Sequence, residues 1–274
     1  MIDRDLIKRA LAEDLQGGQD ITSVATVSGD EKIVADFTAR KSGVVAGIDM
    51  ARAVLEEVGL TDIAVLVKDG ASVKSGEVLM TVRGDTRAIL LAERTALNFL
   101  GHLSGIATLT RTWVDAVAGT NCIIRDTRKT TPGMRLLEKY AVRMGGGTNH
   151  RMSLSDAALI KDNHIAAAGG VAQAFSKVRE KFPTSEIEIE VDTLDQLREV
   201  LPLKPDLVLL DNMSPAQCAE AVSIVAGATK LEASGGISLE NAKAYASTGV
   251  DFLAIGALTH SAPVFDIGLD MRAE

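Results

Sequence analysis

The half of the chain that follows Asn121 repeats one order of elements: an apolar strand, a polar loop and a helix. The expected strands read CIIRDT, DAALIKD, EIEIEVD, DLVLLDN, TKLEASGG and DFLAIGAL. Segments with helical spacing, such as VAQAFSKVREKF and PAQCAEAVSIVA, separate most of them. Alternation of this kind predicts a parallel sheet with right-handed crossover connections. The pattern is compatible both with a small closed barrel and with an open sheet.

Composition supports such a sheet and argues against several classes of protein. Hydrophobic residues make up 46% of the chain but aromatic residues only 3%. The core must therefore consist of Val, Leu, Ile and Ala, which suits strands buried on both faces. No stretch reaches the roughly 18 to 20 apolar residues that a membrane span needs, and the charged N-terminal segment lacks a signal peptide's apolar run. Cys122 and Cys218 form neither a metal-type spacing nor a disulfide framework, so we expect a cytoplasmic protein with no membrane partner.

The first part of the chain mixes helices and strands. Spacing predicts helices over residues 3–14 and 49–58, strand-like runs over residues 32–39 and 44–46, and two further strands, IAVLVKDG and EVLMTVRG. A long helix is expected from Thr86 to about Leu100. A Gly-His-Leu break, followed by Ser104 as an N-cap, predicts a second helix that reaches Val117.

Charge is distributed unevenly along the sequence. The formal net charge of −8 argues against nonspecific nucleic-acid binding. From Arg125 to Lys161, however, eight Lys and Arg residues face three Asp and Glu residues, a local balance of +5. A basic island in an acidic protein indicates an anionic small ligand, although a solvated basic face would give the same count.

The residues that end the expected parallel strands carry the chemistry. The first two strands run into Arg128, Lys129 and Lys161, the next two end at Glu190 and Asp211, and the last two run into Ser234-Gly235-Gly236 and Gly256-Ala257. Strand ends are commonly polar in any protein, so each residue alone has a structural explanation. Because the carboxyl ends of parallel strands meet at one edge, however, we expect the whole set to converge on one pocket.

These side chains suit three tasks. Arg and Lys at 128, 129, 151 and 161 can neutralise carboxylates or phosphates. Glu190 and Asp211 can accept hydrogen bonds from sugar hydroxyls or hold Mg²⁺. The two glycine turns precede helices, so their backbone N–H groups can bind a phosphate. His150 could bind a carboxylate or only order its loop, and no HExxH, CxxC, GxSxG or Walker-type motif is present.

Several long motifs occur together and in order. They are ERTALNFLGHLSGIATLT, RDTRKTTPGMRLLEKYAVRMGGGTNHR, DAALIKDNHI, LLDNMSP, EASGGISLEN and VDFLAIGALTHSAP. With them the chain resembles the quinolinate phosphoribosyltransferase family over nearly its whole length. The resemblance implies an α/β sandwich domain over residues 1–115, on which residues 262–274 pack, and an open α/β barrel over residues 116–261. It also implies a head-to-tail homodimer.

The resemblance further implies an activity and a set of site residues. The activity is that of a pentosyltransferase, which transfers a phosphoribosyl group from phosphoribosyl pyrophosphate to quinolinate and gives nicotinate mononucleotide, pyrophosphate and CO2. Arg94 of the partner subunit, Arg128, His150, Arg151 and Lys161 would bind quinolinate. Other expected substrate-binding groups are Thr127, Lys129, Glu190 and Asp211, and the expected phosphate-binding residues are Ser234, Gly235, Gly236, Ile255, Gly256 and Ala257. Lys129, Lys161, Glu190 and Asp211 would be catalytic, the two acids with Mg²⁺ directly or through substrate and water.

Two alternatives stay open on sequence alone. A paralogous enzyme could ribosylate another heterocycle with the same sugar-phosphate site. A barrel could also retain that site as a binding module without turnover, although the complete set of acids and cations argues against this. A nicotinate–quinolinate comparison tests the first alternative, and a single-turnover assay tests the second.

Overall fold

The computed structural model describes residues 2–272, which fall into two units. The first unit contains the residues up to Arg111, the segment Leu136–Gly146 and the residues from Ser261 on. The second contains Thr112–Arg135 and Gly147–His260. The last two residues of the predicted tail 262–274 lie outside the described part. Within that part, no helix combines the length and the apolar character needed to cross a membrane.

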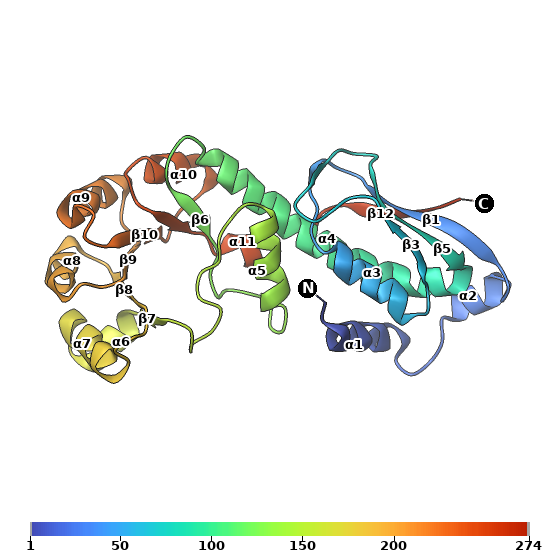
Figure 1. Ribbon diagram of the computed structural model, residues 1–274, viewed down its shortest axis with the longest axis horizontal. Helices are drawn as coiled ribbons and strands as arrows, with labels where there is room; N and C mark the ends of the chain where they lie inside the picture. The colour runs from blue at the N-terminus through green and yellow to red at the C-terminus, as the bar shows by residue number, and fades with distance from the viewer. Residues whose placement is uncertain (1, 273–274) are drawn as a thin grey trace. The chain divides into compact units, whose positions relative to one another are not determined.

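The first unit is built on a four-stranded antiparallel sheet in the order β12-β1-β5-β3. Helices α3 and α4 lie along one face of this sheet (Figure 1). The strands are β1 (Lys32–Ala39), β3 (Asp62–Val65), β5 (Val78–Asp85) and β12 (Ile267–Arg272), with a separate pair β2 (Gly43–Val44) and β4 (Ser72–Val73). The helices are α1 (Arg4–Leu15), α2 (Ile21–Thr26), α3 (Ile48–Glu57), α4 (Thr86–Ala116), which continues past the unit boundary, and α5 (Arg135–Met144).

The expected interruption of the long helix is wrong, because α4 runs unbroken from Thr86 to Ala116. Ser104 is fully buried inside α4, and its hydroxyl bonds to both backbone groups of Ala46 instead of capping a helix. The glycines near it allow close packing: a Cβ on Gly105 would lie 2.2 Å from the Pro263 carbonyl oxygen. Glycine at this position therefore reflects a tertiary contact within the first unit and not a helix end.

The second unit contains six parallel strands in the order β6-β11-β10-β9-β8-β7. They are β6 (Ile123–Arg125), β7 (Ala158–Ile160), β8 (Ile187–Val191), β9 (Leu207–Asp211), β10 (Lys230–Ser234) and β11 (Phe252–Ala254). All six strands expected from the sequence are confirmed. Strands β6 and β7 end the series without pairing to each other, so the barrel is open.

Helices connect these strands and begin at residues that favour helix starts. Ser214 and Gln217 form a capping box at α9, with Pro215 in the first turn, and Thr193 and Gln196 form another at α8. The helices are α6 (Asp162–Ala168), α7 (Val171–Lys181), α8 (Leu194–Val200), α9 (Pro215–Val225), α10 (Leu239–Ala246) and α11 (Ala257–His260), and a short 3₁₀ turn covers Leu201–Leu203. Each connection thus returns the chain to the amino end of the parallel sheet, so that all six strands end at the same opposite edge, where the polar strand ends gather.

Candidate active site

A cavity of about 290 Å³ lies at the carboxyl ends of the parallel strands in the second unit. Its position follows from the strand–helix alternation, which places every loop that follows a strand at this edge. Nine of the residues predicted from the sequence line it: Thr127, Arg128, Lys129, His150, Arg151, Lys161, Glu190, Asp211 and Ser234. The cavity therefore collects cations from the loops after β6 and before β7, and acids from β8 and β9.

Arg128 and Arg151 form the cationic side of the cavity. The Nε atom of Arg128 is buried without a hydrogen-bond partner. Arg151 donates from Nη1 to the Ala157 carbonyl oxygen at 2.9 Å, which holds its side chain against the loop. Burial lowers the pKa of Arg151, and the nearby Arg128 cation lowers it further. Two half-buried guanidinium groups that repel each other favour a ligand with two negative groups.

Glu190 and Asp211 form the acidic side. Glu190 is buried at the end of β8 and pairs with the Lys161 ammonium at 2.5 Å. Asp211 accepts a hydrogen bond from the Asn212 side chain at 2.6 Å. Burial raises the pKa of Asp211, and the carboxylates of Glu190 and Asp192 raise it further. These acids repel each other, so a cation or a set of hydroxyl donors would stabilise them.

The glycine turn after β10 is set by a close approach between two loops. Gly235 has φ +85°, and a Cβ there would lie 2.2 Å from the Asn212 side-chain oxygen. The Asn212 N–H donates to the Ser234 carbonyl oxygen at 2.9 Å, which joins the loops after β9 and β10. Gly236 has φ +61° and open space where a side chain would stand. The turn thus keeps its backbone free of side-chain bulk, as a phosphate-binding turn requires.

The turn after β11 lies against Lys129. A Cβ on Gly256 would come 3.0 Å from Lys129 Cδ, and Thr259 Oγ1 donates to the Lys129 carbonyl oxygen at 2.8 Å. The lysine stem therefore crosses this turn, whose Ile255, Gly256 and Ala257 follow the cavity-lining Ala254. Gly235, Gly236 and these three residues lie next to the lining residues without lining the cavity themselves.

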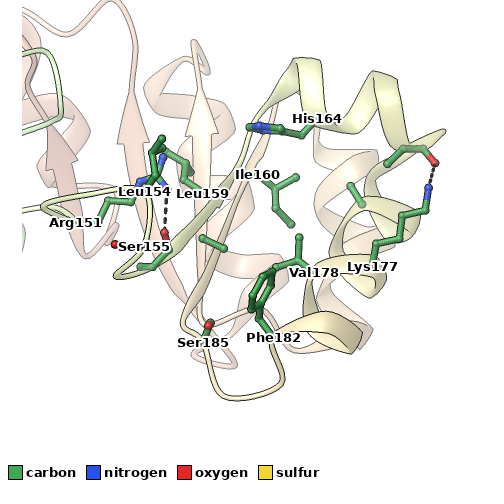
Figure 2. Close-up of a pocket in the computed structure, with 14 residues that line it drawn as sticks. Arg151, Leu154, Ser155, Leu159, Ile160, His164, Lys177, Val178, Phe182 and Ser185 are labelled. Carbon is green, nitrogen blue, oxygen red and sulfur yellow. Dashed lines mark hydrogen bonds between the residues drawn. The ribbon is translucent and has the colours of Figure 1, made fainter.

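A second and larger cavity, of about 630 Å³, lies beside β7 and α7 (Figure 2). Its walls are largely apolar, with Leu154, Ile160, Val178 and Phe182 among them. Arg151 borders both cavities. Because the larger cavity has no acidic side chain in its lining, the smaller one is the candidate active site.

Two family descriptions together match most of this chain. The family descriptions "Quinolinate phosphoribosyl transferase, N-terminal domain" and "Quinolinate phosphoribosyl transferase, C-terminal domain" match residues 20–104 and 106–270. The chain belongs to the quinolinate phosphoribosyltransferase family.

Its relatives match over nearly their whole length. A nicotinate-nucleotide pyrophosphorylase [carboxylating] from Mycobacterium leprae is 54% identical, over 98% of this chain and 96% of the relative. A probable enzyme of the same name from Bacillus subtilis is 40% identical, over 98% and 93%. The crystal structure of the nicotinate-nucleotide pyrophosphorylase from Ehrlichia chaffeensis superposes with a TM-score of 0.94 at 40% identity, and the match covers 98% of each chain.

One residue that the family resemblance assigns to the site lies in the other unit. Arg94 is an exposed residue of α4, before the unit boundary at Arg111. It is not among the residues that line the cavity. Its assignment to the site of a partner subunit stays a prediction.

Two buried residues at the base of this candidate site, Glu188 and Glu232, were not expected from the sequence. Glu232 lines the cavity and pairs with Arg125 at 2.9 Å. Glu188 lies 2.7 Å from the ring of His150. A signal was available, because side chains two positions apart in a strand share a face. Glu188 therefore faces the same side as Glu190, and Glu232 the same side as Ser234.

Proposed function

We propose that this protein transfers the phosphoribosyl group of phosphoribosyl pyrophosphate to quinolinate, and that nicotinate mononucleotide, pyrophosphate and CO2 are the products. The reaction would supply NAD biosynthesis. The observation that carries the proposal is the division of one cavity into a cationic side with two arginines and an acidic side with two carboxylates. The names of the relatives from Mycobacterium leprae and Bacillus subtilis support the same reaction.

The cationic side fits the two carboxylates of quinolinate. Arg128 offers a buried Nε–H without a partner, and a carboxylate can accept two parallel hydrogen bonds from one guanidinium. Arg151, His150 and Lys161 complete this half of the proposed site. Binding a dianion would offset the repulsion between the two guanidinium groups, and this would contribute favourably to the binding free energy.

The acidic side fits the ribose. Cleavage of the bond between ribose and pyrophosphate develops positive charge at the anomeric carbon, and a fixed carboxylate can stabilise that charge. Glu190 and Asp211 are the candidates, held by β8 and β9. Attack by the pyridine nitrogen of quinolinate then completes the transfer. The positive charge on the ring favours loss of the adjacent carboxylate as CO2, because it stabilises the electron pair left on the ring carbon, which then takes up a proton from water. Most of the catalysis would be positioning and electrostatics.

The residues present fit a divalent, oxygen-seeking cation. Lys161 already neutralises Glu190, whereas burial, followed by the charges of two nearby carboxylates, raises the pKa of Asp211. Asp211 is therefore the group best placed to hold Mg²⁺, with Glu190 beside it, directly or through substrate and water. When bound, Mg²⁺ would neutralise charge on the departing pyrophosphate.

The phosphates fit the lysines and the glycine turns. Lys129 and Lys161 would face the pyrophosphate. The backbone N–H groups after β10 and β11 would hold the 5′-phosphate at Ser234, Gly235, Gly236, Ile255, Gly256 and Ala257. The stem of Lys129 lies across Gly256, so this lysine can act beside the second turn.

Two further parts of the proposal concern assembly and location. The resemblance supports a homodimer in which each cavity receives Arg94 from the partner subunit. A cytoplasmic location agrees with the two buried free cysteines, Cys122 and Cys218.

The test of the activity is pyrophosphate release by the purified protein in the presence of phosphoribosyl pyrophosphate. Release that depends on quinolinate supports the proposal. Release with nicotinate but not with quinolinate would favour a paralogous enzyme for another heterocycle. Binding without product in a single-turnover assay would favour a binding module.

The test of the shared site mixes two inactive variants, Arg94→Ala and Glu190→Ala. In a mixed dimer one cavity would contain only unchanged groups. Random exchange makes about half of the dimers mixed, each with one intact site, so activity should recover to roughly a quarter of wild type. If native mass spectrometry confirms exchange and the mixture stays inactive, Arg94 does not act across the interface.

A further inference from the structure

Four buried or half-buried side chains form a cluster at the base of the cavity, which we call the basal cluster: Arg125, His150, Glu188 and Glu232. Glu188 Oε2 lies 2.7 Å from His150 Nε2, and Glu232 Oε2 lies 2.9 Å from Arg125 Nη1. His150, Glu188 and Glu232 are all less than one-tenth exposed. A cluster of this kind, enclosed beneath a substrate cavity, requires either a structural or a functional explanation.

The hydrogen bonds of His150 determine which of its nitrogens carries the proton. The backbone N–H of Arg151 donates to His150 Nδ1 at 2.8 Å, so Nδ1 must present a lone pair. A neutral ring then carries its hydrogen on Nε2, which faces the Glu188 carboxylate as a donor. Both ring nitrogens of His150 are therefore engaged by the protein itself.

This tautomer argues against a metal ion in the basal cluster. Ligand atoms of His150, Glu188 and Glu232 lie within 4.8 Å of one another, close enough to suggest a metal site. A metal bound at Nε2, however, needs a lone pair on that nitrogen. In the neutral ring the lone pair is on Nδ1, and Nε2 carries the hydrogen. Arg125 Nη1 also already donates a hydrogen bond to Glu232. The cluster is better explained by hydrogen bonds than by a metal.

We propose that Glu188 is a positioning residue for quinolinate binding, which acts through His150 on Arg151. Glu188 holds the ring by Nε2–H, and the ring in turn holds the Arg151 backbone N–H by Nδ1. The backbone of His150 is fixed as well, because its N–H donates to the buried Asp126 at 2.9 Å. The inference rests on the proposed function, since quinolinate is the ligand that Arg151 would bind.

The chain of contacts ends at Arg151, whose guanidinium must be held in place in the cavity. Arg151 and Arg128 repel each other, so the Arg151 guanidinium would turn away from the cavity if its backbone were free to move. The bond from Nη1 to Ala157 anchors the far end of the side chain, and the bond to His150 anchors the near end. Loss of the near anchor should therefore weaken the binding of the dianion more than that of phosphoribosyl pyrophosphate.

Substitution of His150 by its two amide analogues breaks the chain of contacts from Glu188 to Arg151 at one link at a time. The side-chain oxygen of Asn can take the place of Nδ1, so His150→Asn keeps the acceptor for Arg151. The amide of Gln reaches the place of Nε2, so His150→Gln keeps the Glu188 contact and loses that acceptor. His150→Asn in turn loses the Glu188 contact, so each variant breaks one link between Glu188 and Arg151. We expect both variants to raise the quinolinate dissociation constant by about tenfold or more, with little change in the affinity for phosphoribosyl pyrophosphate. Wild-type affinity for quinolinate in either variant would overturn the proposal.

A second pair of variants tests Glu188 itself. Glu188→Gln keeps an oxygen that accepts from Nε2–H, so it should bind quinolinate nearly as well as wild type. Glu188→Ala should lose about as much affinity as His150→Gln, with little change in the affinity for phosphoribosyl pyrophosphate. Glu220→Ala and Glu220→Gln, on the surface of α9, are matched controls that should bind both ligands as wild type does. If Glu188→Gln is as weak as Glu188→Ala, the contact does not act by hydrogen bonding and the proposal fails.

A spectroscopic measurement on the unaltered protein keeps the test independent of folding defects in the variants. Nitrogen NMR of the four histidines should assign the neutral Nε2–H tautomer to His150, and the other tautomer or a doubly protonated ring would contradict the proposal. Failure of the wild-type protein to bind quinolinate in calorimetric titration would instead contradict the proposed function. The two failures are thus distinguishable.

Discussion

The cationic and acidic sides of the cavity are built by different parts of the fold. Glu190 and Asp211 belong to strands, and the pairing of Glu190 with Leu209 fixes the position of β8 against β9. Arg128 and Arg151 stand in loops, and Arg151 owes its direction to hydrogen bonds with Ala157 and His150. On the proposed function, strand register would fix the position of the acids that face the sugar, and loop contacts would fix the position of the cations that bind quinolinate.

Each side is also unfavourable alone in a way that its proposed ligand would correct. Burial and the Arg128 charge lower the pKa of Arg151, and burial and two carboxylates raise the pKa of Asp211. An anion on the first side and a cation on the second would reverse these effects. Because the pKa of Arg151 is lowered and that of Asp211 is raised, an anion should act on the first side and a cation on the second, so the two sides can be tested separately.

Removal of divalent cations should have the largest effect and should act on the acidic side alone. We expect excess chelator to abolish pyrophosphate release, because the donors available there are oxygens that suit Mg²⁺. Quinolinate binding, measured by calorimetric titration, should persist. Added Mg²⁺ should restore turnover, and full turnover in chelator would show that the acidic side works without a metal.

Arg128→Ala should act on the cationic side alone. Removing one guanidinium leaves a desolvated carboxylate of quinolinate unpaired, at a cost of roughly 2 to 5 kcal/mol in binding free energy. The affinity for phosphoribosyl pyrophosphate should change far less. Calorimetric titration of both ligands measures the split, with the surface variant Arg198→Ala in α8 as the control. Equal losses for the two ligands would remove the distinction between the sides.

The acids at the base of the cavity should make the stability of the protein depend on pH. Burial, followed by the nearby Glu188 carboxylate, raises the pKa of Glu232 to about 7 from its ordinary 4.5. The folded state therefore holds a proton that the unfolded state has lost between these values, so the free energy of unfolding should fall as the pH rises through this window.

Urea unfolding at about pH 5 and about pH 8 measures this dependence. Glu232→Gln cannot ionise and can still accept a hydrogen bond from Arg125, so it should lose less stability than wild type over the same interval. Glu188, whose pKa burial also raises to about 7, should leave part of the dependence in place. An unchanged dependence in Glu232→Gln would mean that this carboxyl does not change its protonation state there.

The sequence predicted the parallel strands well because their signal is local. Each strand is a short apolar run with a polar end, and all six were found at the expected places. The predicted helix break before Ser104 was wrong because Gly105 packs closely against Pro263, which is distant in sequence, and does not end a helix. The helix α5 was not expected, although its buried Leu137, Ala141 and Val142 have helical spacing. The pairing of β12 with β1 was not expected in detail, since it joins two segments that are distant in sequence.

The cavity was predictable for a similar reason, and only in part. Residues at strand ends can be read from the sequence, and seven of the nine predicted residues that line the cavity follow or end a strand, whereas His150 and Arg151 stand in the loop before β7. Glu188 and Glu232 lie one step deeper in their strands, where an acid in an apolar run gives no indication of its partners. The contacts of His150 with Glu188 and with the Arg151 backbone join a loop to a distant strand, so they required the structure.

The smallest expected effects are on stability, and they differ between the two glycine turns. Gly235→Ala places a Cβ at φ +85° and 2.2 Å from the Asn212 side-chain oxygen, so it should cost about 1 to 2 kcal/mol of stability from backbone strain alone. At Gly256 the nearest atom is Cδ of the flexible Lys129 side chain, at 3.0 Å. Gly256→Ala should therefore change stability by only about 0.5 kcal/mol or less.

The same lysine makes Gly256→Ala informative despite its small effect on stability. A displaced Lys129 stem should raise the KM for phosphoribosyl pyrophosphate and leave the quinolinate affinity unchanged, because Arg128 and Arg151 are not touched. Steady-state kinetics with each substrate varied in turn, together with urea unfolding, gives both quantities. Gly59→Ala, at a left-handed glycine of the first unit with open space around it, is the control for the backbone strain expected in Gly235→Ala. If Gly256→Ala alters quinolinate affinity as much as that of the sugar phosphate, the second turn does not belong to the phosphate side of the cavity.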